Sequence, residues 1–220
     1  LGKVETLRKP LILLSFLVIA LTLFFISSQS KSDAYRIATT PSLISKGTFG
    51  QSIVVEMSYS YPEIKEWITS VQNNKILFLL EYDWLQRSKD YVKLLKDSNA
   101  NTGLLISSSQ TLPSIKEHIN LYTELFEHPP IWAACSPDPC SDEIVQYLFD
   151  EKMNSLATSI YIKQLDDFKQ IKKGDIASFE IKRGATPPPD VLTRIISHPF
   201  ISIEENIIGI TYGTKRYPNE

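Results

Sequence analysis

Two glutamates stand at the ends of apolar segments, where their side chains can reach a shared face. Glu81 directly follows the apolar run 76–80, and Glu180 is the last residue but one of the run 176–181. Two carboxylates that converge across a sheet can supply the acid and the base, or the nucleophile, of glycoside hydrolysis. A carboxylate at a strand end can equally be a helix cap or a solvated side chain. Both interpretations stay open for Glu81 and Glu180.

Aromatic side chains fall at or just beyond the predicted strand ends. Their faces, with nearby hydroxyls and carboxylates, can stack on and hydrogen-bond a sugar ring. The alternative is that the two tryptophans of this set are simply packed in the core, because large aromatic side chains are mostly buried. The candidate ligand-binding residues are Tyr59, Tyr82, Trp84, Trp132 and Tyr161.

The three histidines, His118, His128 and His198, have no short ligand spacing among them. A histidine-rich zinc centre needs two or three imidazoles brought together, so we expect no metal site and no cofactor. Each histidine is expected at the surface or at a helix cap. The 23 Lys and Arg residues against 25 Asp and Glu residues form no basic stripe, which argues against nucleic acid as a partner.

The two cysteines, Cys135 and Cys140, enclose the short loop SPDP. In an exported domain they can oxidise to a disulfide that closes this turn. Zinc is a poorer interpretation because no second pair of Cys or His lies nearby. The sequence therefore predicts a disulfide, with free thiols as the alternative.

The N-terminal part has the pattern of a membrane anchor. Residues 10–28 are almost entirely apolar and just long enough to span a bilayer. The basic residues before them place residues 1–9 in the cytoplasm and the rest of the chain outside, as a single-pass protein of the cell membrane. A cleaved signal peptide is the main alternative, and a buried core helix is a third. Polar residues 29–50 are expected to be a linker.

Beyond the linker, residues 51–220 alternate short apolar runs with amphipathic stretches, the pattern of an α/β fold with parallel strands. We expect a small distorted (β/α) barrel whose strand ends line the functional face. Asp83 and Asp142 are candidate helix N-caps. The expected strands are 53–57, 76–80, 103–107, 131–134, 156–161, 176–181, 201–203 and 207–211, and the expected helices are 62–71, 84–97, 113–126, 142–152 and 187–197.

Three stretches of this body have local patterns of a known family. ILFLLEYDWLQRSKDYVKLLKDSNANTGLLISSS resembles a strand, an aromatic-led helix and a GHEIGNH passage; IWAACSPDPCSDEIVQYLFDEKMNS resembles an RPPYG loop with its helix; KKGDIASFEI resembles a late GDIVLLHD strand. Together, over residues 53–203, they resemble the NodB-homology polysaccharide deacetylases, carbohydrate esterases that remove acetyl groups from chitin-like and peptidoglycan sugars. The resemblance implies their distorted α/β barrel.

The family's chemistry does not carry over with the segments. Its metal-binding and catalytic TFDDG segment would fall on residues 57–60, which hold no aspartate, and its H-x-x-x-H pair on Ser107 and Thr111. The RPPYG loop would fall on residues 132–136 without its arginine or glycine, and the late histidine on Glu180. Ser and Thr hydroxyls are poor zinc ligands. The resemblance therefore implies a deacetylase-like protein without metal or deacetylase activity.

These patterns predict a membrane-anchored, extracytoplasmic, non-catalytic deacetylase-like domain that binds cell-envelope glycan or another envelope protein. One alternative is an active carbohydrate hydrolase or deacetylase with a rebuilt carboxylate site at Glu81 and Glu180. The other is a protein-interaction module with no small ligand at all.

Overall fold

The computed structural model describes residues 37–71 and 75–209. The predicted anchor 10–28, the cytoplasmic segment 1–9 and the first part of the linker lie outside the described residues. Within the described ranges no helix is long and apolar enough to span a bilayer. The described residues belong to one compact unit that starts at Ile37.

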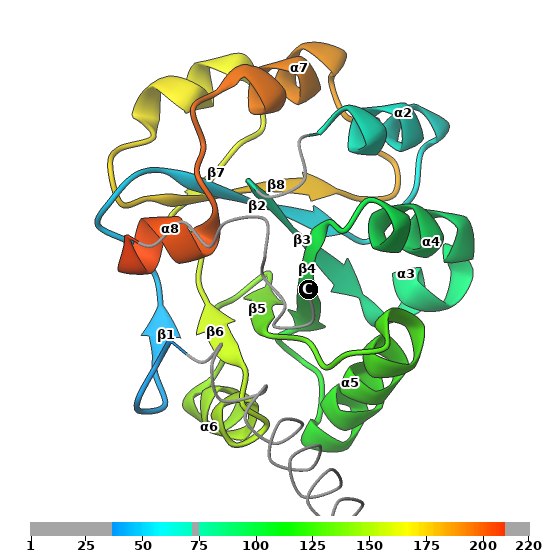
Figure 1. The fold of residues 1–220 in the computed structure, drawn as a ribbon, viewed down its shortest axis with the longest axis vertical. Helices are drawn as coiled ribbons and strands as arrows, with labels where there is room; N and C mark the ends of the chain where they lie inside the picture. The colour runs from blue at the N-terminus through cyan, green and yellow to red at the C-terminus, as the bar shows by residue number, and fades with distance from the viewer. Residues whose placement is uncertain (1–36, 72–74, 210–220) are drawn as a thin grey trace, which may run out of the picture. The chain divides into compact units, whose positions relative to one another are not determined.

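One curled sheet of eight strands organises this unit (Figure 1). Its order is β1-β6-β5-β4-β3-β2-β8-β7, and every neighbouring pair is parallel. The prediction of a parallel α/β fold is confirmed in the form of a curled half-barrel with β1 and β7 at its edges. The strands are β1 (Leu43–Ile44), β2 (Ser52–Met57), β3 (Ile76–Glu81), β4 (Asn101–Ser107), β5 (Trp132–Ser136), β6 (Asn154–Leu156), β7 (Ile160–Tyr161) and β8 (Ile176–Ile181).

Most helices connect the strands and pack on the outer face of the sheet, whereas α8 packs its Ile203 in the inner cluster. Alternate residues of β2 show the division: Ile53, Val55 and Met57 pack among helix residues, whereas Val54 packs in a separate inner cluster with Leu79 and others. This period of two follows from the strand geometry. The helices are α2 (Pro62–Ser70), α3 (Tyr82–Arg87), α4 (Lys89–Asp97), α5 (Leu112–Phe126), α6 (Asp142–Asp150), η1 (Leu165–Gln170), α7 (Pro189–Ser197) and α8 (Ile203–Ile208).

The predicted helix 84–97 is two helices, because Ser88 leaves the helical conformation with φ −108° and ψ 43°. Its hydroxyl lies 2.9 Å from Ser60 Oγ, in the segment that follows β2. The predicted caps also shift: Asp83 lies in the first turn of α3, and Ser141 rather than Asp142 caps α6. The predicted strand 156–161 divides into β6 and β7.

The predicted strand pair at 201–203 and 207–211 is wrong, because residues 203–208 form helix α8. Ser202 Oγ accepts a hydrogen bond from Glu205 N at 3.1 Å, the capping pattern of a Ser followed three residues later by a Glu. Gly209 ends the helix in the left-handed conformation at φ 68°. These local start and stop signals outweigh the strand preference of the isoleucines between them.

The predicted linker is wrong for residues 37–50, which are built into the fold. Leu43 and Ile44 of β1 pair with Ser155 and Leu156 of β6. Gly47 N donates to Gly174 O at 2.7 Å. Because the backbone groups of this polar stretch find partners in the sheet and its turns, composition alone misplaced the domain boundary.

The amide of Asn206, on α8, joins this N-terminal segment to the sheet. Its Oδ1 accepts from Gly50 N at 3.1 Å, and its Nδ2 donates to Ser52 Oγ at 2.9 Å and to Asp175 O at 3.2 Å. Its backbone carbonyl accepts from Thr48 N at 2.8 Å. Asn206 is fully buried, so these bonds are not exchanged for water. One side chain therefore links α8, the start of β2 and the start of β8.

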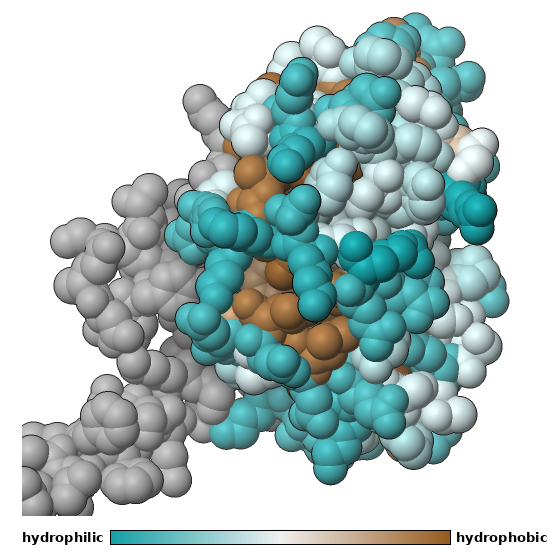
Figure 2. Space-filling view, turned by 90° about the vertical axis from the view of Figure 1, so that its right-hand side faces the viewer, coloured by the Kyte–Doolittle hydropathy of each residue, from teal (hydrophilic) through white to brown (hydrophobic). Residues whose placement is uncertain are grey.

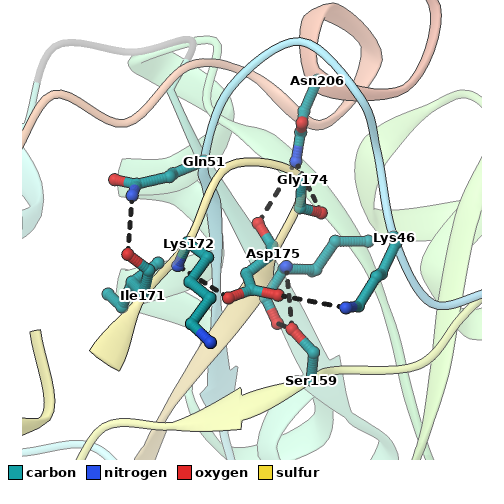
Figure 3. Close-up of polar contacts among 9 residues, drawn as sticks. Lys46, Gln51, Ser159, Ile171, Lys172, Gly174, Asp175 and Asn206 are labelled. Atoms are coloured by element: carbon teal, nitrogen blue, oxygen red, sulfur yellow. Dashed lines mark hydrogen bonds and ion pairs between the residues drawn. The ribbon is translucent and has the colours of Figure 1, made fainter. Parts of the chain in front are cut away.

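The Asp175 carboxylate extends this network (Figure 3). One oxygen accepts from Lys172 N at 2.7 Å, and the other lies 3.9 Å from Lys46 Nζ. The lysine is largely exposed, so the ion pair contributes little compared with the backbone bond. The carboxylate therefore acts mainly by holding the turn that leads into β8.

Replacing Asn206 with Ala should lower the free energy of unfolding by about 2–4 kcal/mol, because Gly50 N and Ser52 Oγ lose their buried partner. Urea unfolding of the variant and the wild type measures this difference. Asn120→Ala, on the exposed side of α5, is the matched control and should change stability by less than about 0.5 kcal/mol. Equal stability of the two variants would contradict the role of Asn206.

Candidate functional site

The carboxyl ends of three adjacent strands bring three glutamates together on the inner face of the sheet. Glu56 of β2 is the direct partner of Glu180 on β8 in the parallel register. Glu81 ends β3 on the other side of β2. On its own strand, each glutamate lies an even number of residues from an inner-face residue: Glu56 from Val54, Glu81 from Leu79 and Glu180 from Ile176. All three side chains therefore lie on the inner face. We call this carboxyl end of the sheet the mouth, and Glu56, Glu81 and Glu180 the mouth carboxylates.

Glu56 lies deepest, with 4% of its surface exposed. Burial raises the pKa of its carboxyl, and the charge of Glu180 raises it further, while the hydroxyls of Ser178 and Ser136 and the charge of Lys182 oppose the rise. Since desolvation penalises the charged form, this carboxyl holds its proton to higher pH than an ordinary glutamate does.

Glu81 and Glu180 are both more exposed than Glu56. Burial also raises the pKa of half-buried Glu81, helped by the charges of Asp83 and Glu180 and opposed by that of Arg87. The Glu180 side chain is 39% exposed and pairs with Lys182 Nζ at 2.5 Å. Strands are about 4.8 Å apart, so Glu180 faces Glu56 across one strand spacing and Glu81 across two. The predicted Glu81 and Glu180 pair therefore shares one mouth with a third carboxylate.

Three of the candidate aromatic residues lie at or just after strand ends and are at least partly exposed. Tyr59 follows β2 and packs edge-on against Tyr61, with 4.9 Å between the ring centroids. Tyr82 follows β3 and is half-buried. Tyr161 is 49% exposed on edge strand β7, where it pairs with Ser178. Their binding role stays a prediction.

The two tryptophans do not belong to this set. Trp84 is fully buried and donates from Nε1 to Ser60 Oγ at 2.8 Å. Trp132 is 2% exposed at the start of β5, the opposite end from the mouth, and donates to Glu204 Oε1 at 3.0 Å. The prediction that they bind ligand is wrong, because both are core residues whose indole N–H already has a partner.

Searches of family models and of curated proteins find no match to this chain. Solved structures do match. They include a wild-type family 4 carbohydrate esterase (CE4) pseudoenzyme, BA3943 from Bacillus anthracis, at TM-score 0.60 and 16% identity over 76% of this chain and 69% of that one. A mutant of it with restored enzymatic activity matches at TM-score 0.58 and 15% identity over 72% of this chain and 65% of that one.

The Bc1960 peptidoglycan N-acetylglucosamine deacetylase matches at TM-score 0.62 and 11% identity, over 74% of this chain and 91% of that one. This chain has the CE4 fold. The chain spans about 65% of the mutant pseudoenzyme's length, and identities this low establish the fold alone. The matching structures belong to the polysaccharide-deacetylase family, which the order of segments in the sequence predicted.

The CE4 fold implies a metal, but the residues at the corresponding strand ends do not fit one. Ser107 Oγ lies 2.9 Å from Ser109 Oγ, and Thr111 Oγ1 lies 3.3 Å from Ser114 Oγ, so both hydroxyls interact within their own loop. Among residues 37–71 and 75–209 no group of three His, Cys, Asp or Glu is arranged to hold a metal ion. We therefore derive no metal-dependent step.

His118 is fully buried on α5. The prediction that it is a surface or cap residue is wrong, because it lies on the apolar side of α5, where its Nε2 lies 3.0 Å from Leu80 O. Burial lowers its pKa to about 4. It stays neutral at physiological pH and packs edge-on against Tyr82, so it supports the mouth without lining it.

Cys135 and Cys140 form a disulfide, with an S–S distance of 2.08 Å, as the sequence predicts. Cys135 lies in β5 and Cys140 precedes α6, so the bridge closes the loop that follows β5. That loop begins at Ser136, one of the hydroxyls facing Glu56. The disulfide therefore constrains the position of one side of the mouth.

Glu56 is the site residue that sequence reasoning missed. It lies inside the run IVVEM, which we interpreted only as a buried strand. A carboxylate is rarely fully buried without a partner, so a single acidic residue within an otherwise apolar strand was the available signal. Side chains two residues apart on a strand lie on the same face, so Glu56 lies on the inner face with Val54.

Glu56→Gln should stabilise the unit at neutral pH by about 1 kcal/mol, because it removes a buried charge and keeps the side-chain shape. A raised native pKa means that the wild type loses stability as pH rises through that pKa, so the advantage of the variant should grow with pH. Urea unfolding across a pH series measures it. Glu124→Gln, exposed on α5, should show no such trend, and a Glu56 variant that behaves like it would contradict the assignment.

Proposed function

We propose that this chain is a non-catalytic domain of the CE4 fold that binds a cell-envelope glycan at its mouth. One observation supports this most directly. The strand ends that face the mouth present carboxylates and hydroxyls, from Glu56, Glu81, Glu180 and Ser136, where a metal-dependent esterase needs a set of metal ligands. Such a surface can hydrogen-bond sugar hydroxyls without activating water through a metal.

The neighbours support both halves of this proposal. BA3943 is described as a pseudoenzyme of this fold, and a mutant of it has restored enzymatic activity. Bc1960 is a peptidoglycan deacetylase. The fold thus occurs both with and without activity, and a ligand related to envelope glycan is the natural candidate for this chain. Another envelope protein is the alternative partner.

The surface on the mouth side suits a sugar. Strands β2 and β8 run toward the right in Figure 1, and Figure 2 shows the molecule from that side, with apolar surface surrounded by hydrophilic side chains. A pyranose ring has the matching properties, since its C–H face packs on apolar groups while its hydroxyls bond to the polar edge. The partly exposed side chains of Tyr59 and Tyr82 and the exposed side chain of Tyr161 are candidates for such packing.

We further propose that residues 10–28 anchor the chain in a bacterial cytoplasmic membrane, with the CE4-fold unit outside. The length and apolar character of this segment and the basic residues before it support this arrangement. An anchor would hold the mouth close to the envelope, where the proposed glycan lies.

The full chain, incubated with acetylated peptidoglycan or chitin fragments and divalent metal ions, should release no acetate, because hydroxyls replace the metal ligands. Measuring acetate release tests this, with an active deacetylase as the positive control. Metal-dependent release would overturn the non-catalytic assignment.

The same samples also test the alternative of a hydrolase with a rebuilt carboxylate site, which the grouping of Glu56, Glu81 and Glu180 favours. New reducing ends that appear with the wild type and disappear in Glu180→Gln would support a hydrolase.

Cell fractionation should recover the full chain with membranes, resistant to high-salt washing and released by detergent. A variant that lacks residues 1–30 should become soluble. External protease should degrade the body of the full chain in spheroplasts, because the positive-inside rule places it outside. Recovery of the intact chain in the soluble fraction would contradict anchoring.

A further inference from the structure

We propose that the end of the sheet at which the strands begin docks on an anionic phospholipid surface. This inference rests on the proposed anchor at residues 10–28 and names the surface of the unit that meets the membrane. The docked orientation turns the mouth away from the bilayer, toward the envelope glycan. We call the docking surface the basic edge, and it consists of six exposed residues: Lys46, Phe49, Lys75, Lys172, Lys173 and Ile196.

The turns that lead into β2 and β8 lie side by side and carry three of these lysines. Lys46 Nζ lies 3.9 Å from one oxygen of Asp175, and the backbone N–H of Lys172 donates to the other oxygen. Figure 3 shows the two lysine side chains on either side of this carboxylate. Lys173 is the next residue and is exposed as well. Because Asp175 is buried, the ammonium groups rather than its carboxylate meet a partner at this surface.

Two exposed apolar side chains belong to the same edge. Phe49, in the turn before β2, is 56% exposed. Ile196, in the last turn of α7, is 43% exposed and lines one cavity with Lys75 and His198. His198 Nε2 lies 2.8 Å from Oε1 of Gln51, the residue before β2, so this part of the surface adjoins the turn of Phe49. The basic edge is therefore continuous around the starts of β2, β3 and β8.

The acidic side chains of α8 that adjoin the basic edge offset only part of its charge. Glu204 Oε1 accepts a hydrogen bond from the buried Trp132 indole, and Glu205 is partly exposed. Anionic headgroups attract lysines near the membrane surface, and an aromatic ring enters the interface below them. Four ammonium groups with Phe49 and Ile196 match both layers. An acidic protein surface is the alternative partner and is an outcome of the test below.

The length of chain before the unit independently favours the membrane as the partner. Ile37 N donates to Asn154 Oδ1 at 2.9 Å, and Asn154 is the first residue of β6. The described chain therefore enters the unit at the end where the strands begin. Residues 29–36 separate Ile37 from the proposed anchor and reach at most about 28 Å when fully extended. An anchored chain therefore keeps this end of the sheet, which carries the basic edge, within reach of the bilayer.

Tryptophan fluorescence of the full chain in nanodiscs of phosphatidylglycerol and brominated phosphatidylcholine tests the docking. In Phe49→Trp the new indole should emit at shorter wavelength than in detergent and should be quenched by the brominated acyl chains. Tyr161→Trp is the matched control, because Tyr161 is 49% exposed on β7 and outside the basic edge, and it should be neither shifted nor quenched. The three native tryptophans are buried and give the same background in both variants: Trp67, Trp84 and Trp132.

Replacing two lysines tests the role of charge. Lys172→Ser combined with Lys173→Ser, in the Phe49→Trp background, should lower the ratio of docked to undocked unit about tenfold or more. Nanodiscs without phosphatidylglycerol should have a similar effect. Lys65→Ser combined with Lys116→Ser removes the same charge from exposed positions on α2 and α5 and should leave the quenching unchanged.

The outcomes separate this inference from the anchor on which it rests. Failure of the full chain to co-purify with the nanodiscs would overturn the anchor and the docking together. Co-purification without quenching at position 49 would overturn the docking alone and would leave an acidic protein as the partner of the basic edge. Quenching that persists in neutral nanodiscs and in the double lysine variant would overturn the role of charge. Circular dichroism of each variant identifies any loss of quenching that comes from misfolding.

Discussion

The buried amide of Asn206 is the interaction on which the arrangement of this unit depends. It links helix α8 to the starts of β2 and β8 through four side-chain hydrogen bonds. The same residue thereby joins the N-terminal segment to β2, β8 and the last helix. Gly47 shows how close the segments come, since a Cβ there would clash with the Asn206 carbonyl oxygen. The N-terminal end of the curled sheet is therefore tightly closed.

This closure has a consequence at the other end of the strands. Fixing the starts of β2 and β8 fixes their register, and the register places Glu56 beside Glu180. A slip of one residue would turn Glu56 toward the helices, where it would meet the apolar side of the core. The closed end therefore fixes the register, while the opposite ends of the same strands carry the three carboxylates. The disulfide between Cys135 and Cys140 limits movement on the β5 side of that mouth.

Much of the sheet could be predicted from the sequence, because its central strands are short apolar runs buried on both faces. Helix α8 could not be predicted from isoleucine content, since its caps at Ser202 and Gly209 outweigh strand preference. Trp132 was misplaced because it stands at the start of β5, whereas the carboxyl ends of parallel strands form the functional face. Glu56 was missed because its neighbours made the segment resemble pure core. Local sequence patterns predicted individual strands and helices. The candidate site instead depends on the register between strands that lie far apart in the chain, such as β2 and β8.

The electrostatic state of Glu56 connects stability to the site. A leucine at this position would pack with Val54 and Leu79 at no desolvation cost, whereas a carboxylate at 4% exposure beside Glu180 is unfavourable when ionised. Ser136 and Ser178 reduce that cost without cancelling it. Protonation of Glu56 offsets the remaining cost, which is why burial raises the pKa of its carboxyl. The protonation of this one side chain therefore makes the stability of the unit depend on pH, at the same strand ends that form the candidate site.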